Sequence, residues 1–187
     1  MSYCHFITHT TDAKRAIHKK YHDTQYGFAI HDDDELFARL ILEINQAGLS
    51  WETILKKEAA FRRAYSGFSV AKVANYGEKD RQRLMNDAGI IRNRLKINAA
   101  IENAKAIISL QKEFGSFEKW LASQHLKTKS DGSISELTYW VKLFKRQFKF
   151  TGGEIVNEFL MSIGYLGGAH DVDCPIYKKT RRSIARN

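Results

Sequence analysis

The sequence has 187 residues, of which 43% are hydrophobic, enough for one well-packed domain, and this content excludes a disordered chain. No apolar run is long enough to cross a bilayer, so we expect no membrane association. The first residues, MSYCHFITHTTDAK, lack the hydrophobic core of a signal peptide, which predicts a cytoplasmic protein.

The protein is strongly basic. Lysine and arginine outnumber aspartate and glutamate by 30 to 21, a formal net charge of +9. This excess favours a polyanionic partner, because basic side chains near phosphates release condensed counterions. A basic surface without any such partner would give the same total, and charge alone does not separate the two interpretations.

Helical periodicity dominates the chain, and no segment shows the alternation of a half-buried strand. The stretch 33–48 carries an apolar stripe, with Asp33 or Asp34 as its cap and Gly48 as its end. Similar stripes predict helices over 50–67, after the turn at Gly89, over 135–148 and over 154–164. The apolar residues of these stripes are Leu36, Phe37, Leu40, Ile41, Ile44, Trp51, Ile54, Leu55, Phe61, Ile97, Ile101, Ala104, Ile108, Leu137, Val141, Phe144, Phe148, Ile155, Phe159 and Ile163. The pattern predicts an all-α fold.

One linker is visible, the polar and turn-forming KTKSDGSIS at 127–135. It separates a first helical lobe from a C-terminal helical pair. We therefore expect residues 1–187 to form a single domain of two helical lobes.

Two cysteines, Cys4 and Cys174, stand near opposite ends of the chain. A disulfide is conceivable, but in a chain without an export signal metal binding is the better interpretation. His170 and Cys174 have the three-residue gap of a metal-ligand pair, and a tetrahedral structural zinc needs two more ligands. His18 and His22 lie four residues apart on one predicted helix face, and either could join Cys4. A buried thiol with solvated histidines is the alternative.

Glu43 lies in the otherwise apolar run LILEINQAG, where a buried carboxylate is costly unless it is paired. From the residues alone, an amphipathic helix with Glu43 on its polar face is the favoured interpretation. Trp51 could likewise be an ordinary core residue at the start of a helix.

Four segments carry a family resemblance. The segments YHDTQYG (21–27), ILEINQAGLSW (41–51), DAGIIRNRLKI (87–97) and FKFTG (148–152) resemble the 3-methyladenine DNA glycosylase I family, in the family's order. The resemblance implies a helix-hairpin-helix DNA glycosylase fold whose termini are held together by one zinc ion. The implied zinc ligands are Cys4, His22, His170 and Cys174. Four protein ligands leave no open coordination position, so this zinc is expected to be structural.

The resemblance also implies an activity: monofunctional excision of 3-methyladenine from alkylated double-stranded DNA, by a monomer. Glu43 matches the glutamate that recognises the base, and a carboxylate suits a purine made cationic by methylation. Trp51 and Tyr21 match the aromatic residues of the base pocket. His18 stands where the family commonly has a pocket tyrosine, and it is assigned to substrate binding.

Two loops are assigned to DNA by the same resemblance. Gly48 and Leu49 belong to the loop that approaches the lesion, with Leu49 as a wedge for the vacated base stack. Thr151 and Gly152 form a turn that opens a helix, where free backbone N–H groups suit a phosphate.

The match departs from the family in several places. The spacing from Cys4 to His22 is longer than usual, Tyr26 replaces a tryptophan, and GGEIVNEFLMSIG (152–164) lacks the family's Thr-rich start. These departures leave an alternative open, a zinc-stapled helical DNA-binding protein that recognises damage or structure without excising a base. A helical scaffold for a protein partner explains the basic charge least well. Arg92, Arg94 and Lys96 form a basic cluster that could bind phosphate or form a solvated face, and the solvated face is the favoured interpretation.

Overall fold

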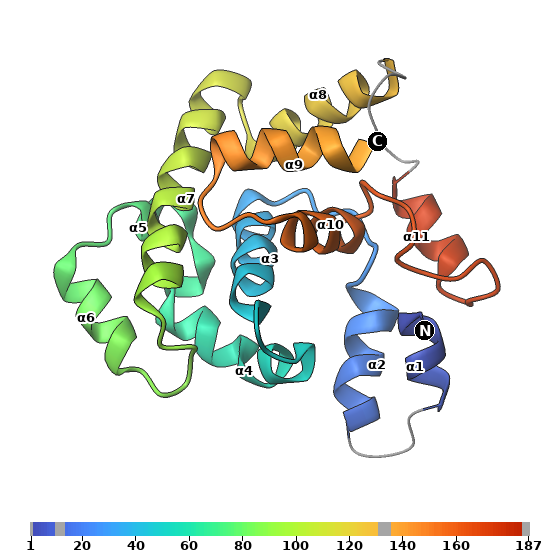
Figure 1. Cartoon of the computed structure of the whole chain (residues 1–187), viewed down its shortest axis with the longest axis horizontal. Coiled ribbons are helices and arrows are strands. Elements are labelled where there is room, and N and C mark those ends of the chain that lie inside the picture. Colours follow the sequence, from blue (N-terminus) through green and yellow to red (C-terminus); the bar gives the residue numbers. More distant parts are fainter. Residues whose placement is uncertain (1, 10–13, 131–135, 185–187) are drawn as a thin grey trace.

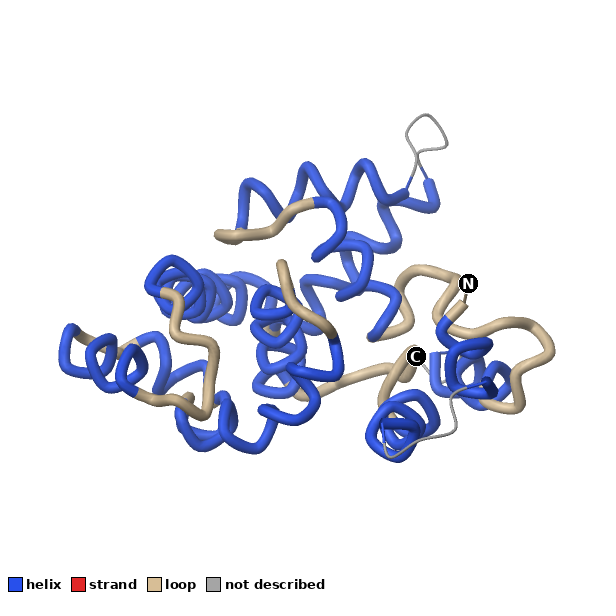
Figure 2. Tube along the Cα trace, turned by 60° about the horizontal axis from the view of Figure 1, so that its bottom comes forward, coloured by secondary structure: helices blue, strands red, loops and turns tan. Residues whose placement is uncertain are grey.

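The computed structural model describes residues 2–9, 14–130 and 136–184, and every regular element in these ranges is a helix (Figures 1 and 2). The all-α prediction is therefore confirmed. None of the described helices is long and apolar enough to cross a membrane. In chain order the elements are α1 (Tyr3–His9), α2 (Lys14–Thr24), α3 (Asp33–Gln46), α4 (Trp51–Ala64), the short 3-10 helix η1 (Ser66–Phe68), α5 (Val70–Ala74), α6 (Glu78–Asn86), α7 (Arg94–Phe114), α8 (Phe117–Ser130), α9 (Glu136–Gln147), α10 (Gly153–Ser162) and α11 (Tyr177–Ile184).

Helix α3 lies at the centre of the fold, with α4, α7, α8 and α10 packed against it (Figure 1). Its predicted apolar stripe is fully buried, but every other residue from Leu36 to Asn45 is buried as well. A helix covered on all sides has no solvated face. The interpretation of Glu43 as a residue on a polar helix face is therefore wrong.

The three aspartates at the start of α3 have other roles than the predicted cap at Asp33 or Asp34. The cap is Asp32, whose carboxylate accepts a hydrogen bond from the Glu35 amide at 2.9 Å. Asp33 instead accepts from the backbone amides of Phe117 and Glu118, at 2.8 and 3.0 Å, and so caps α8 from outside that helix. Asp34 accepts from the Val70 amide. Consecutive side chains on the first turn of a helix point in different directions, so three adjacent aspartates serve three elements.

Helices α9 and α10 form a hairpin that packs on α3 through α10. Phe144 and Phe159 are fully buried between them, whereas Leu137, which the periodicity placed on the buried stripe, is 36% exposed at the start of α9. The Thr151 hydroxyl donates to the Phe144 and Phe148 carbonyl oxygens and closes the turn.

The linker predicted at 127–135 begins later than expected. Helix α8 continues to Ser130, and residues 131–135 lie outside the described part of the chain. Helix α1 packs against α2, and the C-terminal segment that leads into α11 lies near them (Figure 1).

Asp33→Ala should lower the free energy of unfolding by about 2–3 kcal/mol, because two amides at the start of α8 lose a charged acceptor. Urea unfolding monitored by circular dichroism measures the change. Asp32→Ala is the matched control and should cost about 1 kcal/mol, the usual value of one exposed cap. An Asp33 loss no larger than the Asp32 loss would contradict the assignment.

Candidate base pocket and metal cluster

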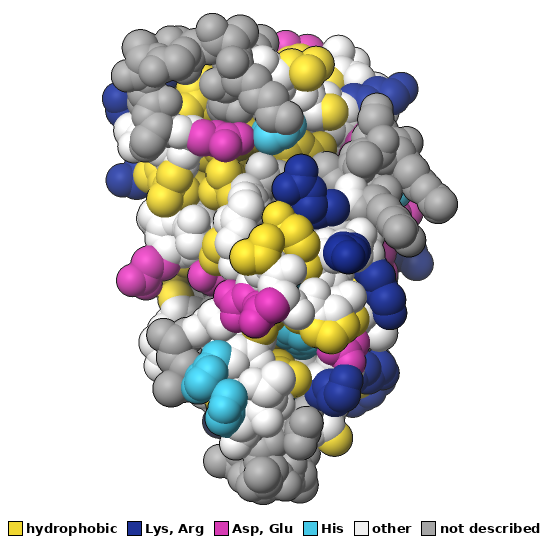
Figure 3. Space-filling view, turned by 90° about the vertical axis from the view of Figure 1, so that its right-hand side faces the viewer, with side chains coloured by type: hydrophobic (Ala, Val, Ile, Leu, Met, Phe, Trp, Pro, Cys, Tyr) yellow, Lys and Arg dark blue, Asp and Glu magenta, His cyan; other side chains and the backbone are white. Residues whose placement is uncertain are grey.

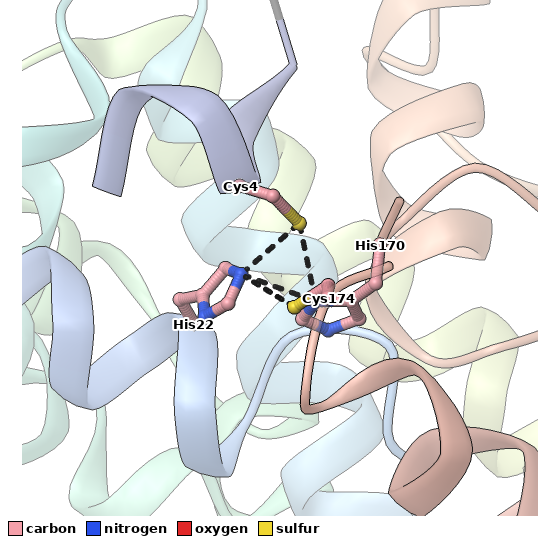
Figure 4. A group of neighbouring side chains, drawn as sticks. All are labelled: Cys4, His22, His170 and Cys174. Carbon is pink, nitrogen blue, oxygen red and sulfur yellow. Dashed lines mark hydrogen bonds between the residues drawn. The ribbon is translucent and has the colours of Figure 1, made fainter. Parts of the chain in front are cut away.

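Four side chains from both ends of the chain converge on one point, Cys4 from α1, His22 from α2, and His170 and Cys174 from the loop before α11 (Figure 4). Cys4 Sγ lies 3.2 Å from His22 Nε2 and 3.6 Å from His170 Nδ1. Cys174 Sγ lies 3.7 Å from each of the same two nitrogens. Ligand atoms around a tetrahedral zinc are about 3.3–3.8 Å apart, given bond lengths of roughly 2.0–2.3 Å. The cluster can therefore hold a metal ion.

The hydrogen bonds of the two histidines determine which nitrogens face the cluster. His22 Nδ1 lies 2.7 Å from Asp23 Oδ1, and His170 Nε2 lies 2.7 Å from the Tyr26 carbonyl oxygen. Each oxygen accepts a hydrogen bond from a ring N–H, so the remaining nitrogens, 3.2 Å apart, both present lone pairs. Two lone pairs at this distance repel one another unless a cation lies between them. This arrangement of outer partners is typical of metal-binding histidines.

Gly27 allows the C-terminal loop to approach. Its φ is +78°, and a Cβ at this position would lie 2.9 Å from Ala169 Cβ and 3.1 Å from the His170 ring. Any larger residue would push His170 out of the cluster. Both cysteines are free thiols, so the structure contains no disulfide between Cys4 and Cys174.

A cavity of about 380 Å³ opens beside this cluster. Three of the four predicted base-binding residues, Tyr21, Glu43 and Trp51, line it together. The remaining lining residues are Ser2, Tyr3, Tyr26, Gln46, Glu158, Met161 and Gly168.

Glu43 is the most unusual group in this cavity. Its side chain is only 4% exposed, and among the described residues no hydrogen bond reaches its carboxyl group. Burial raises the pKa of Glu43 to about 8, and the nearby charge of Arg39 only partly opposes this effect. Because Glu43 lines the cavity, its carboxyl group is available to a ligand there.

Aromatic rings form the walls of the cavity. Tyr21 lies 5.1 Å from Trp51 and 5.6 Å from Tyr26, measured between ring centroids. The Tyr21 hydroxyl accepts a hydrogen bond from Arg39 at 2.7 Å, which fixes its ring. Trp51 Nε1 is buried and has no hydrogen-bond partner among the described residues. A planar, aromatic ligand would find stacking surfaces in this cavity.

His18, the fourth predicted base-binding residue, does not line the cavity. Its ring is buried and its Nδ1 lies 2.8 Å from the Tyr3 hydroxyl. Tyr3 lines the cavity itself, so His18 contacts the wall of the cavity from behind.

A larger groove of about 850 Å³ continues from the cavity, and Glu43, Gln46 and Glu158 line both. The predicted DNA-contacting residues Gly48, Leu49 and Gly152 lie on this groove. Leu49 is 41% exposed, on a loop where Gly48 has a φ of +84°. Thr151 is buried, and its hydroxyl is engaged within the hairpin.

The loop at 47–50 rests on a buried lysine. Lys96 Nζ donates to the Asn45 and Ala47 carbonyl oxygens, at 3.0 and 2.8 Å, and so caps the end of α3. The interpretation of Lys96 as part of a solvated face is wrong, whereas Arg92 and Arg94 are exposed as expected.

Sequence reasoning missed several pocket residues. Tyr3 and Glu158 were not singled out, and Tyr26 was noted only as a departure from the family pattern. Glu158 had a usable signal, because it is an acidic residue inside the largely apolar run EIVNEFLMSIG, as Glu43 is in its own helix. Tyr3 had no such signal, since a tyrosine next to Cys4 is unremarkable until α1 is placed against α2.

Comparison with known proteins identifies this all-helical architecture. Residues 11–177 match the family model described as methyladenine glycosylase. DNA-3-methyladenine glycosylase 1 of Escherichia coli strain K12 is 36% identical over 168 residues, which are 84% of this chain and 89% of that protein. DNA-3-methyladenine glycosylase of Haemophilus influenzae is 32% identical over 178 residues, 87% of this chain and 93% of that protein. This chain belongs to the methyladenine glycosylase family.

Solved structures agree with this membership. A tyrosine-to-phenylalanine variant of 3-methyladenine DNA glycosylase I, in complex with 3-methyladenine, superposes with a TM-score of 0.80 at 33% identity, covering 94% of this chain and 97% of that one. The Staphylococcus aureus enzyme described by its structural basis of 3-methyladenine recognition has a TM-score of 0.78 at 32% identity, with coverages of 91% and 94%.

Glu43→Gln should become progressively more stable than the wild type as pH rises from 4.5 to about 8. In this window the unfolded wild-type chain releases a proton that folded Glu43 retains, so its free energy of unfolding falls, and glutamine has no such loss. The gap should grow by at most about 1.4 kcal/mol per pH unit. Urea unfolding of both proteins measures it, and a gap that does not change with pH would contradict the buried pKa.

Proposed function

We propose that this protein is a DNA glycosylase that excises 3-methyladenine from alkylated double-stranded DNA in base excision repair. The observation that carries the proposal is the unpartnered Glu43 carboxyl in an aromatic cavity, in a chain of the methyladenine glycosylase family. The names of both curated relatives and the 3-methyladenine complex of a structural neighbour support the same substrate.

Glu43 recognises the base through charge. Adenine methylated at N3 is cationic while it is attached to the sugar, so it gains a charge-assisted hydrogen bond from a carboxylate, and neutral adenine gains less. Tyr21 and Trp51 stack on the base.

The chemistry follows from the same charge. The bond between the base nitrogen and the sugar C1′ breaks, and its electron pair neutralises the cationic base, which therefore leaves without being protonated. Water adds to C1′ and loses a proton to solvent. Glu43 contributes by holding the extruded base in the cavity, so that binding energy offsets the cost of unstacking it.

The groove receives the DNA. The helix-hairpin-helix contact is supplied by the α9–α10 turn, where the cap Gly152 has no side chain and leaves the first amides of α10 open to a phosphate. Thr151 contributes through its backbone, because its hydroxyl is engaged. Leu49, with Gly48 as its hinge, enters the vacated base stack. The net charge of +9 supports a polyanionic partner, and on the face shown in Figure 3 most Lys and Arg side chains gather along one side.

Zinc is the metal that the cluster suits best, since two thiols and two imidazoles are a common structural zinc set. Cys4, His22, His170 and Cys174 would hold it and leave no position for a reacting water. When bound, the ion supplies a cross-link between the two ends of the chain. The scheme uses residues of one chain only, and we propose that the protein acts as a monomer.

The activity is tested by releasing bases from methylated DNA with purified protein. Glu43→Gln should lower excision efficiency by one to two decades, because the lost charge-assisted interaction is worth about 1.5–3 kcal/mol. Binding to undamaged duplex should stay unchanged, since phosphate contacts supply it. Glu102→Gln, exposed on α7, is the charge-matched control and should keep wild-type excision. A fully active Glu43→Gln protein would contradict the assignment of Glu43 to base recognition. Wild-type protein that binds damaged duplex but releases no base would instead support the binding-only alternative.

Metal analysis tests the cluster. One zinc per chain should copurify with the wild type, and Cys174→Ala should lose it. The free energy of unfolding should fall by an amount similar to that of a native cross-link, about 2–5 kcal/mol. Excision should fall as well, because the ligands neighbour cavity-lining residues. Glu43→Gln, which leaves all four ligands, should retain the metal. Protein purified without any metal and with unchanged stability would refute the zinc assignment.

A further inference from the structure

A second carboxyl group lies in the base cavity. Glu158, on α10, lines both the cavity and the groove, as Glu43 on α3 does. Its side chain is half-buried, and one carboxylate oxygen accepts a hydrogen bond from the Tyr26 hydroxyl at 3.2 Å. Because α10 packs directly on α3, the two acidic groups reach one cavity from facing helices.

Among the described residues, no lysine or arginine lines this cavity to neutralise the pair. The charge of the buried Arg39 acts on Glu43, but its guanidinium donates to Tyr21 and to Gln25 rather than to either carboxylate. Burial raises the pKa of Glu158, and the charge of Glu154 adds to this effect, whereas hydrogen bonds from Tyr26 and Asn157 oppose it. The charge of Glu158 in turn raises the pKa of Glu43. Each carboxyl therefore makes ionisation of the other less favourable while the cavity holds no cation.

The aromatic walls of the cavity also suit a cationic ligand. Tyr3, Tyr21, Tyr26 and Trp51 surround it, and the ring centroids of Tyr3 and Tyr26 are 5.4 Å apart at a steep angle. Faces of aromatic rings attract positive charge, and cages of this composition bind cationic ligands. A delocalised cationic purine would relieve the repulsion between the carboxylates and stack on the rings, whereas a neutral purine of the same shape would only stack.

We propose that Glu158, held by Tyr26, is a second base-recognition residue, and that Glu43 and Glu158 together restrict the pocket to purines that carry positive charge. This inference rests on the proposed glycosylase function and specifies its substrate class. A purely structural role, in which Glu158 only ties Tyr26 to α10, would not affect charge discrimination.

The test compares two ligands of equal shape and different charge. The 3,9-dimethyladeninium ion is permanently cationic, and its 3-deaza isostere is uncharged at about pH 8.5, where the carboxyls ionise readily. Binding of each to the full-length protein is measured by calorimetry. The wild type should prefer the cation. Glu158→Gln should reduce this preference about tenfold, the usual effect of losing one charge-assisted contact, while affinity for the neutral isostere changes less than about twofold.

Two further variants complete the experiment. Tyr26→Phe keeps the ring and removes the hydroxyl that holds Glu158, so it should reduce the preference about threefold. Glu102→Gln removes the same charge from an exposed position on α7, outside both the cavity and the groove, and it should leave the preference unchanged. If Glu158→Gln weakens both ligands equally or neither, the inference is overturned. If it fails to fold, as judged by circular dichroism, an unchanged preference in Tyr26→Phe overturns the inference.

The cation preference of Glu43→Gln distinguishes a failure of this inference from a failure of the proposed glycosylase function. If the preference for the cation falls in Glu43→Gln but not in Glu158→Gln, the role proposed for Glu158 is wrong. The glycosylase proposal is then unaffected. Wild-type protein that neither prefers the cation nor releases 3-methyladenine from DNA overturns the proposed function itself.

Discussion

A carboxyl group on a helix that has no solvent-facing side is the constraint on which the site depends. Helix α3 is buried from Leu36 to Asn45, with α4, α5, α7, α8, α10 and η1 packed against it, so Glu43 cannot reach bulk water along its own helix. Burying such a group without a partner is costly, and a fold that retains it must recover that cost elsewhere. The cavity lined by Tyr21, Trp51 and Tyr26 is where a cationic ligand would do so. The proposed base-recognition residue is therefore also a costly residue of the core.

The metal cluster and the cavity are parts of one construction. Three ligands, Cys4, His22 and His170, neighbour residues in the sequence that line or border the cavity: Tyr3, Tyr21 and Ala169 with Gly168. Joining the two ends of the chain therefore also positions two tyrosine rings against Glu43. A cluster without an open coordination site would still influence base recognition, through the rigidity of this wall.

The departures from the family pattern also acquire a physical meaning. His18 stands at a position where the family commonly has a pocket tyrosine, and here its ring supports Tyr3, which reaches the cavity from α1. Tyr26, in place of a tryptophan, provides a hydroxyl that donates a hydrogen bond to Glu158. Of these two changes, Tyr26 lines the cavity directly, and His18 reaches it through Tyr3. They are better explained as a rearranged pocket than as a lost one.

The sequence by itself predicted the helices from their periodicity. Its resemblance to a family, carried by short motifs, predicted the family and the four residues of the Cys/His cluster, whereas spacing alone left His18 and His22 as alternatives. The sequence indicated Glu43 only as an oddity, since the pattern of α3 is compatible with a half-exposed helix. Only the tertiary structure decided that α3 is covered on all sides, that Asp33 caps α8 rather than its own helix, and that Lys96 supports the loop before α4. It also brought Tyr3, Tyr26 and Glu158 to the same cavity. The reason is physical: a side chain's burial and partners depend on which helices pack against it, and those helices lie far apart along the chain.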